Sequence, residues 1–369
     1  MKTAYSLKST VESNVEEIKA GFDGIEPRAV VFFASSSFDP YAVSREMSNA
    51  FPNASVFGCT TAGEIVSGLM LKRSIVAMAL DSGVLDDVMT VTIKDLNGAE
   101  PIEEAMAMFE AHYGQPVMDM DYERYVGIIL VDGLSMAEER MIDVIGDLTN
   151  VTFIGGSAGD DLQFKKTHVF ADGMAYSGAA VLALLKLKVG FDIIKTQSFC
   201  PTGKVLKATK VNEYKREVME FNGKPAAVSY AETIGVSVEE APGHFMRNPV
   251  GLMIGEDPYV RSPQQIQDGS MIFYCKVKEG MELSVLESTD IIEDTRKAVE
   301  TKKLELGDVS GIINFHCILR TLELENKGQT QPYGKLFADI PTIGFSTYGE
   351  QYIGHVNQTS TMLIFRGNP

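Results

Sequence analysis

The chain has 369 residues, of which 45% are apolar and 22% charged, a composition typical of a globular protein with a large core. Its formal net charge of −17 argues against a nucleic-acid or anionic-membrane partner, since both depend on clustered Lys and Arg. No apolar run reaches the roughly 18–20 residues of a membrane span, and the N-terminus lacks the apolar region of a signal peptide. We therefore expect a cytoplasmic protein without membrane insertion.

The first elements predict alternating helices and strands. Residues 1–24 are expected to form an amphipathic helix, because Val11, Val15, Ile18 and Phe22 recur at helical spacing. "AVVFFAS" (29–35) predicts a strand buried on both faces. A helix in "PYAVSREMSNAF" and a strand in "ASVFG" follow, and the apolar segments 74–80 and 88–93 are expected to form a hairpin.

The next elements repeat this alternation. A helix in "IEEAMAMFEAHYG" precedes a strand at 125–133, then come the helix "MAEERMIDVIGDL" and the strand "VTFIGG". A hairpin is expected around "HVFADGMAYSGAAVLALLKL". The order predicts an α/β fold with mixed sheets, because the later strands favour antiparallel pairing.

A short pattern recurs in the chain. "GCTTAGE" starts at Gly58, "GGSAGD" at Gly155 and "GFSTYGE" at Gly344. Each copy follows an apolar strand, holds Ser or Thr, and ends on a glycine and an acid, and each has another apolar strand some 30 residues upstream. A weaker copy, "GLMIGE" at Gly251, makes the spacing nearly even. The pattern predicts four related α/β modules, two in each of two similar-sized halves.

The polar stretch 205–225 is the expected boundary between the halves. We predict an N-terminal helix at 1–24, an N-terminal domain at 25–215 and a C-terminal domain at 216–369.

The repeated turns are candidate ligand sites. A glycine pair after a strand allows close approach of the backbone, and free N–H groups with Ser or Thr hydroxyls can bind an anion at the strand ends. A tight connection without a ligand is the alternative. The candidate ligand-binding residues are Gly58, Cys59, Thr60, Gly155, Gly156, Ser157, Gly344, Ser346 and Thr347.

Enzyme signatures are missing from the sequence. It contains no P-loop, no GxSxG elbow, no HExxH, no EF-hand loop and no kinase signature. The four cysteines form no CxxC and are expected to be reduced thiols. A hydrolase using Cys59 or Ser157 beside a glycine turn stays open as an alternative, but we expect no catalysis.

His355 is the histidine with the strongest case for a ligand role. It follows the third turn, with Tyr348 and Tyr352 close in sequence. His112 is expected at a helix end, where a cation suits the helix dipole. His316 is expected on a strand, opposite in direction to Phe315 and Cys317.

Six ordered motifs resemble those of FIST proteins, which carry an N-terminal and a C-terminal FIST domain. These motifs are "VFGCTTAGEI", "LVDGLS", "FIGGSAGDD", "NPVGL", "FHCILR" and "GFSTYGE". The resemblance implies a sensory domain that binds a small ligand, with amino acids among the proposed ligands. It covers residues 25–367.

"YGEQYIGHVNQT" further resembles the nitric-oxide-sensing haem proteins of this family. That likeness implies haem as cofactor and a histidine kinase, diguanylate cyclase or phosphodiesterase as signalling partner. His355 would be the axial metal ligand, with Arg320, Tyr348 and Tyr352 around the cofactor. Arg320 could instead hold an amino-acid carboxylate or pair with Glu323. A sensor for an amino acid without haem is therefore the alternative function.

Overall fold

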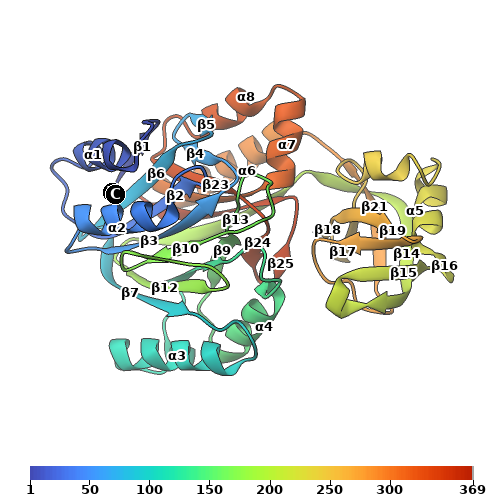
Figure 1. Ribbon diagram of the computed structural model, residues 1–369, viewed down its shortest axis with the longest axis horizontal. Coiled ribbons are helices and arrows are strands. Elements are labelled where there is room, and N and C mark those ends of the chain that lie inside the picture. The colour runs from blue at the N-terminus through green and yellow to red at the C-terminus, as the bar shows by residue number, and fades with distance from the viewer. Residues whose placement is uncertain (368–369) are drawn as a thin grey trace. The chain divides into compact units, whose positions relative to one another are not determined.

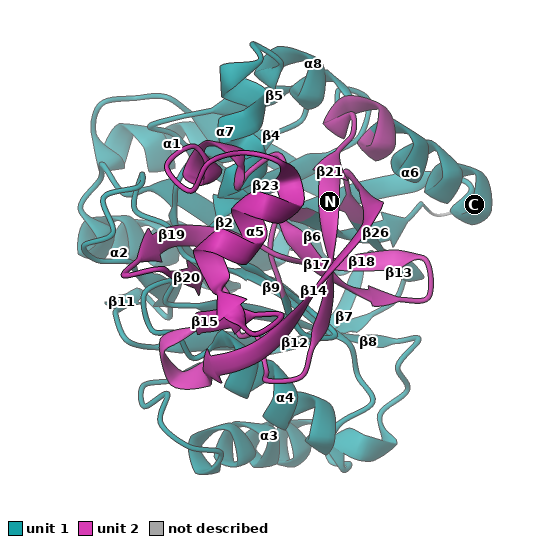
Figure 2. Cartoon of the chain, turned by 90° about the vertical axis from the view of Figure 1, so that its right-hand side faces the viewer, with its two compact units in different colours: residues 1–195, 296–355, 360–369 teal, residues 196–295, 356–359 magenta. Residues whose placement is uncertain are grey.

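The structure is a computed structural model that describes residues 1–367. The chain divides into two compact units, shown in different colours in Figure 2. Unit 1 comprises residues 1–195, 296–355 and the described residues from 360 onward, and unit 2 comprises residues 196–295 and 356–359. Unit 2 is thus a long insertion in the sequence of unit 1.

Unit 1 contains three modules that share one order of elements (Figure 1). The first module consists of β1 (Lys2–Ser6), α1 (Val11–Gly21), β2 (Pro27–Ser35), α2 (Pro40–Ala50), β3 (Ser55–Thr61), β4 (Glu64–Val66), β5 (Leu69–Leu71) and β6 (Ile75–Asp81). The second consists of β7 (Leu85–Ile93), α3 (Glu100–Tyr113), a short 3-10 helix η1 (Val117–Asp119), β8 (Tyr125–Val131), α4 (Glu138–Leu148), β9 (Phe153–Ser157), β10 (Val169–Ala171), β11 (Met174–Tyr176) and β12 (Ala180–Leu187).

The third module is interrupted by unit 2. It consists of β13 (Phe191–Gln197), α6 (Ile291–Leu306), β22 (Val309–Cys317), α7 (Ile318–Asn326), α8 (Thr330–Lys335), β23 (Thr342–Thr347), β24 (Glu350–Tyr352), β25 (His355–Val356) and β26 (Thr359–Arg366). The boundary between the units falls inside β13, α6, β25 and β26.

Each module is built on one parallel strand pair. These pairs are β2 with β3, β8 with β9, and β22 with β23. Helices connect the paired strands, as a parallel connection requires. The upstream strand and the glycine turn that recur in the sequence are the two ends of this βαβ unit.

The modules exchange strands in a closed cycle. The first sheet has the order β1-β6-β2-β3-β10-β11, the second β7-β12-β8-β9-β24-β25 and the third β13-β26-β22-β23-β4-β5. Strand β10 of the second module therefore pairs with β3 of the first, β24 of the third with β9 of the second, and β4 of the first with β23 of the third. No module completes its sheet from its own strands.

The paired strands are apolar on both faces because each face is covered. On the inner faces, Val31 and Phe33 of β2, Leu130 of β8 and Phe315 of β22 belong to one shared core. On its outer face, β2 packs against α1 and α2 through residues such as Phe32. Figure 1 shows α3 and α4 side by side along the corresponding face of the second sheet.

Unit 2 contains one antiparallel sheet with the order β18-β17-β21-β14-β15-β20-β19, and β16 pairs with β15. Its elements are β14 (Phe199–Asn212), η2 (Glu213–Lys215), β15 (Glu217–Phe221), β16 (Lys224–Pro225), α5 (Ala226–Ile234), η3 (Ala241–His244), β17 (Val250–Ile254), β18 (Asp257–Arg261), β19 (Pro263–Gln267), β20 (Ser270–Phe273) and β21 (Glu282–Ser288).

The mixed α/β class is confirmed, but the structure divides the chain differently from the expected similar halves. Gly251 lies in β17, which pairs antiparallel with β18 and β21 in unit 2. The prediction of a fourth module at Gly251 is therefore wrong. The three remaining copies all lie in unit 1. The near-even spacing of the four glycines in the sequence does not reflect four modules. It arises because unit 2, which contains Gly251, is inserted between β13 and β22.

Two local predictions also differ from the structure. Residues 2–6 form a strand that pairs with β6, so the N-terminal helix begins only at Val11. Strands β6 and β7 belong to different sheets and form no hairpin, because β6 pairs with β1 and β2 while β7 pairs with β12. Within the described residues, no helix is long and apolar enough to cross a membrane.

Candidate functional site

The three glycine turns meet at one place in unit 1. We call residues 60–64, 157–161 and 346–350 the three-turn junction. Backbone hydrogen bonds connect them in a cycle: Gly159 N donates to Thr60 O (2.9 Å), Ser157 N to Gly349 O (2.8 Å) and Ala62 N to Ser346 O (3.2 Å). The three turns, far apart in the sequence, therefore lie next to one another in the folded chain.

The backbone donors of the junction are engaged within the protein. Thr60 N donates to His168 O at 2.9 Å and Ser346 N to Gly63 O at 2.8 Å, so neither group belongs to an open anion nest. The nine predicted ligand residues are all buried. Their role in ligand binding stays a prediction, and none of the nine lines the cavity described below.

The first glycine of each turn lies inside a strand and serves the packing of the parallel pair. A Cβ at Gly58 would lie 1.8 Å from Phe32 O, one at Gly155 1.7 Å from Ile129 O, and one at Gly344 2.3 Å from Asn314 O. Such distances are far too short for two atoms that are not bonded to each other, so any side chain here would force the strands apart. The structure therefore explains these glycines without a ligand.

The acid that ends each turn is buried and hydrogen-bonded. Thr61 donates its hydroxyl to Glu64, and Thr347 donates its hydroxyl to Glu350, three residues on in both turns. Asp160 instead accepts from the backbone N–H groups of residues 164–166 and from the Tyr348 hydroxyl, at 2.5 Å. The bond from Tyr348 to Asp160 connects the third turn to the second.

Glu64 has an unusual proton affinity. Burial raises its pKa to about 7, although hydrogen bonds donated by Ser74 and Thr61 favour the charged form, and the nearby Asp161 adds to the rise. A carboxyl group that titrates near neutral pH beside a cavity is a common feature of functional sites.

A cavity of about 270 Å³ opens next to the junction. It lies where strands β2, β3 and β22 end, which is the usual ligand position in α/β sheets. It is lined by Ser37, Ala62, Lys72, Arg73, Asp161, Leu162, Gln163 and Ile318. All three modules of unit 1 contribute to it.

The cavity carries both signs of charge. Lys72 and Arg73 lie between β5 and β6, and Lys72 forms an exposed ion pair with Glu325 at 2.7 Å. Asp161 supplies the negative charge of the cavity, and it accepts hydrogen bonds from the hydroxyls of Ser35 (3.3 Å) and Ser36 (2.9 Å). Arg73 and Asp161 both have left-handed backbones, with φ of 56° and 53°. Strained backbones of this kind cluster at ligand sites.

Helix α7 adds a positive dipole end to the cavity. It begins at Ile318 directly after β22, and no side chain caps its N-terminus. The first N–H groups of a helix have no partner within the helix and favour a negative charge nearby. Because Ile318 lines the cavity, this helix end can meet an anionic group of a ligand.

The predicted haem ligand is part of the junction packing. His355 is 4% exposed, and a Cβ on Gly349 would lie 2.2 Å from its Cε1, so the imidazole rests against the third turn. Its Nδ1 lies 3.5 Å from Gln351 Nε2. An axial ligand needs a nitrogen that faces the haem iron, so the ring of His355 would have to move away from Gly349 to serve as one, and its haem role stays a prediction.

The other predicted cofactor residues have structural contacts. Tyr348 accepts hydrogen bonds from the backbone of Asp160 and Leu162 and stacks on Phe164 with 5.0 Å between ring centroids. Tyr352 lies in β24, opposite Ile154. Arg320 is 1% exposed in α7. Glu323, one of the alternative partners considered for it, pairs with Lys327 at 2.6 Å.

His316 lies in β22 as predicted, on the face away from the shared core. Its Nδ1 lies 2.9 Å from the Tyr333 hydroxyl. Burial lowers its pKa well below the usual value, and the charge of Arg320 lowers it further. The ring is therefore neutral near pH 7.

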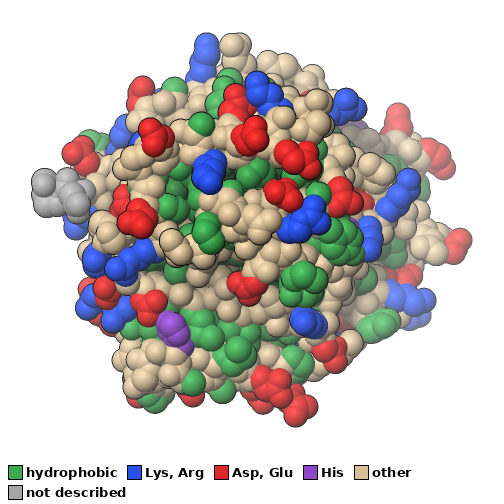
Figure 3. Space-filling model, turned by 60° about the vertical axis from the view of Figure 1, so that its left-hand side comes forward, with side chains coloured by type: hydrophobic (Ala, Val, Ile, Leu, Met, Phe, Trp, Pro, Cys, Tyr) green, Lys and Arg blue, Asp and Glu red, His purple; other side chains and the backbone are tan. Residues whose placement is uncertain are grey.

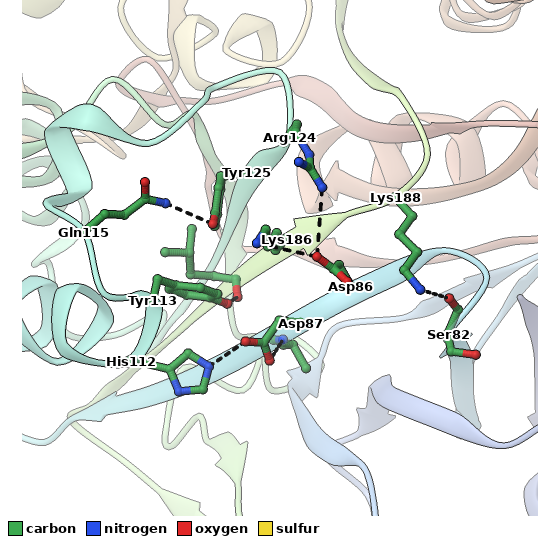
Figure 4. A network of polar contacts seen from close by, with 12 residues as sticks. Ser82, Asp86, Asp87, His112, Tyr113, Gln115, Arg124, Tyr125, Lys186 and Lys188 are labelled. Atoms are coloured by element: carbon green, nitrogen blue, oxygen red, sulfur yellow. Dashed lines mark hydrogen bonds and ion pairs between the residues drawn. The ribbon is translucent and has the colours of Figure 1, made fainter.

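His112 has the structural role expected of it. It lies in the last turn of α3 and pairs with Asp87 of β7 at 2.9 Å (Figure 4). Asp86, which precedes Asp87 in β7, pairs with Lys186 at 3.5 Å and with Arg124 at 3.9 Å. These partly exposed pairs join strands and helix, and pairs of this kind contribute little to stability.

The candidate nucleophiles are inaccessible. Cys59 is fully buried, and burial raises its pKa well above the usual value. Ser157 is also fully buried and donates its hydroxyl to Glu138 at 3.3 Å. Neither fits the exposed, activated nucleophile of a hydrolase.

On the face seen in Figure 3, acidic and basic side chains are interspersed and do not form a basic patch.

Sequence reasoning missed the residues that line the cavity. Lys72 and Arg73 are adjacent cations in an acidic chain, and Asp161 is a second acid directly after the repeat, so each had a weak signal. Only the folded chain brings the three together.

The structure is an α/β protein in which three βαβ modules share one cavity. The chain belongs to the FIST family: a FIST N domain matches residues 28–224 and a FIST C domain matches residues 226–353. FIST domains are sensory domains of signalling proteins and are generally non-catalytic.

Among curated proteins, the chain is similar to an uncharacterized protein of Methanocaldococcus jannaschii. The two are 27% identical over 206 residues, which cover 52% of this chain and 40% of the relative. The chain therefore spans less than half the length of that relative.

Proposed function

We propose that the chain is a sensor whose unit 1 binds a small zwitterion, such as an amino acid, in the cavity beside the three-turn junction. The observation that carries the proposal is the pairing of charges in that cavity. Arg73 and the uncapped start of α7 can hold a carboxylate, and Asp161 can hold an ammonium group.

Binding would act on all three modules at once. Arg73 belongs to the first module, Asp161 to the second and Ile318 to the third. A ligand that contacts all three favours the arrangement in which they are closest, and this shift is the signal. We propose that the output passes to a separate histidine kinase, diguanylate cyclase or phosphodiesterase, as the family resemblance implies.

A thermal-shift screen of the common amino acids tests the proposal. A ligand at 100 times its Kd adds about 2.7 kcal/mol to stability, which raises Tm by a few degrees. Arg73→Gln should abolish the shift, and Asp161→Asn should reduce it. Arg45→Gln is the matched control, because Arg45 is an exposed arginine of α2 that does not line the cavity. A flat response of the unmutated protein to every amino acid would refute the proposal.

Nitric-oxide sensing through haem has only the sequence resemblance in its favour. His355 would have to leave its packing against Gly349 before it could serve as an axial ligand. Absorbance of the haem-loaded protein after desalting tests whether the chain binds haem and whether His355 is its ligand. A Soret band that persists in the unmutated protein and disappears in His355→Ala would replace the amino-acid proposal with this one.

A further inference from the structure

A second cleft of about 310 Å³ lies at the C-terminal end of α4 in unit 1. Its floor is apolar, with Ile142 and Ile145 from the helix and Phe153 from β9. Ile353, from the turn between β24 and β25, lies at its rim and is 72% exposed. Figure 1 shows α4 close to β24 and β25. The cleft is separate from the residues of the ligand cavity.

The backbone of Ile353 is strained. Its φ is 55°, in the left-handed region, which is a genuine outlier for a β-branched residue. A conformation of this kind destabilises the folded state unless other interactions offset it. Burial does not offset this cost, because most of the side chain faces solvent.

The other two modules show that the turn does not need an isoleucine. The equivalent hairpin β10–β11 turns at Asp172 and Gly173, where Asp172 has a φ of 52°. The hairpin β4–β5 turns at Ser67 and Gly68. Asp and Ser are ordinary turn residues, and Asp tolerates the left-handed region. An exposed isoleucine at this position therefore serves something other than the turn.

Negative charge surrounds the apolar floor. Asp143 and Asp147 both line the cleft, and α4 has no basic residue in its last turn. The C-terminal end of a helix is itself negative, so acids here are unfavourable unless a cation lies nearby. The cleft thus offers an apolar surface inside a negative field.

We propose that this cleft, together with Ile353, is a docking surface for a partner-protein segment that carries Lys or Arg beside apolar side chains. The carboxylates of Asp143 and Asp147 would pair with the cations, and the apolar side chains would pack on Ile142 and Ile353. Anionic membranes and nucleic acids are disfavoured by the same carboxylates. The proposal does not depend on the identity of the ligand in the other cavity.

The test uses two synthetic peptides with identical leucine positions, one with lysines and one with glutamates at its polar positions. Fluorescence anisotropy against the full chain should show binding of the lysine peptide only. Ile353→Asn, and separately the pair Asp143→Asn and Asp147→Asn, should each weaken binding at least tenfold. The acid pair should also lower the salt dependence of binding.

Matched controls separate the cleft from general attraction to an acidic protein. Met174→Asn changes a 51% exposed apolar side chain beside the equivalent hairpin turn, and Glu103→Gln with Glu104→Gln removes two exposed acids of α3. Both should leave binding unchanged. Equal losses in these controls, or unchanged binding in Ile353→Asn, would overturn the proposal.

A stability measurement excludes misfolding as the cause. Because Asn adopts the left-handed region readily, Ile353→Asn should melt at the same temperature as the unmutated protein or higher. Analytical ultracentrifugation tests whether the surface binds a second copy of the chain instead of a partner protein. A dimer of the unmutated protein that Ile353→Asn abolishes would show that the surface binds a second copy, and would replace the proposed partner.

Discussion

At the scale of single residues, the acids that end the repeated turns show what a sequence can and cannot reveal. The spacing of Thr61 to Glu64 and of Thr347 to Glu350 is visible in the repeat, and the structure confirms that these turns are equivalent. Their burial could not be predicted, because each turn is covered by the other two. Free hydroxyls and N–H groups were inferred from single turns, whereas the junction uses them internally.

Glu64 makes the stability of the protein depend on pH. Because its folded pKa of about 7 lies above the usual 4.5, its proton stabilises the folded state at low pH. This contribution is complete below pH 4.5 and is lost as pH rises to about 7, and its full size is about 3 kcal/mol.

Urea unfolding from pH 5 to 8 measures this contribution. As pH rises, the unfolding free energy of the unmutated protein should fall relative to that of Glu64→Gln, because the variant has no carboxyl group to deprotonate at this position. Glu12→Gln, at an exposed position of α1, should show a constant difference. A constant difference for Glu64→Gln as well would contradict the raised pKa.

At the scale of elements, the parallel strand pair explains the repeated glycines. The sequence predicted four α/β modules, each from an apolar strand followed by a glycine turn. Three of them are present, at Gly58, Gly155 and Gly344, and the fourth, at Gly251, is not. The prediction assigned the first glycine to the turn, whereas the structure places Gly58, Gly155 and Gly344 within strands, against a neighbouring carbonyl. Contact across strands depends on register, which one sequence does not specify.

Gly155→Ala should destabilise unit 1 by about 3 kcal/mol or more, because the added carbon would overlap with Ile129 O. Gly146→Ala, inside α4, has nothing within 4 Å of the added carbon and should stabilise the helix by up to about 1 kcal/mol. Thermal and urea unfolding of both variants measure the contrast. Similar effects at the two glycines would show that the strand contact is not tight.

At the scale of the whole molecule, the chain combines three interlocked modules with an inserted antiparallel unit. The sequence showed three good copies of the turn, but it could not show that unit 2 interrupts the third module. The cavity likewise depends on all three modules, so no local pattern could predict it. The FIST motifs indicated the family, and the folded chain was needed to find the candidate site.

The exchange of strands predicts that unit 1 unfolds as one cooperative body. Each sheet contains a strand from another module, so no module can open alone without breaking a neighbour's sheet. In native-state hydrogen exchange, the central amides of β2, β8 and β22 should open with the same free energy. A difference above about 2 kcal/mol among the three strands would show that the modules unfold separately.

Titration calorimetry tests the central claim, that the cavity binds a zwitterion through Arg73 and Asp161, most directly. The amino acid with the largest thermal shift is compared with its N-acetyl derivative, which lacks the ammonium group. The unmutated protein should bind the free amino acid at least tenfold more tightly, Asp161→Asn should lose this preference, and Arg73→Gln should bind neither. Equal affinity of the unmutated protein for both compounds, or a preference that survives in Asp161→Asn, would contradict the account.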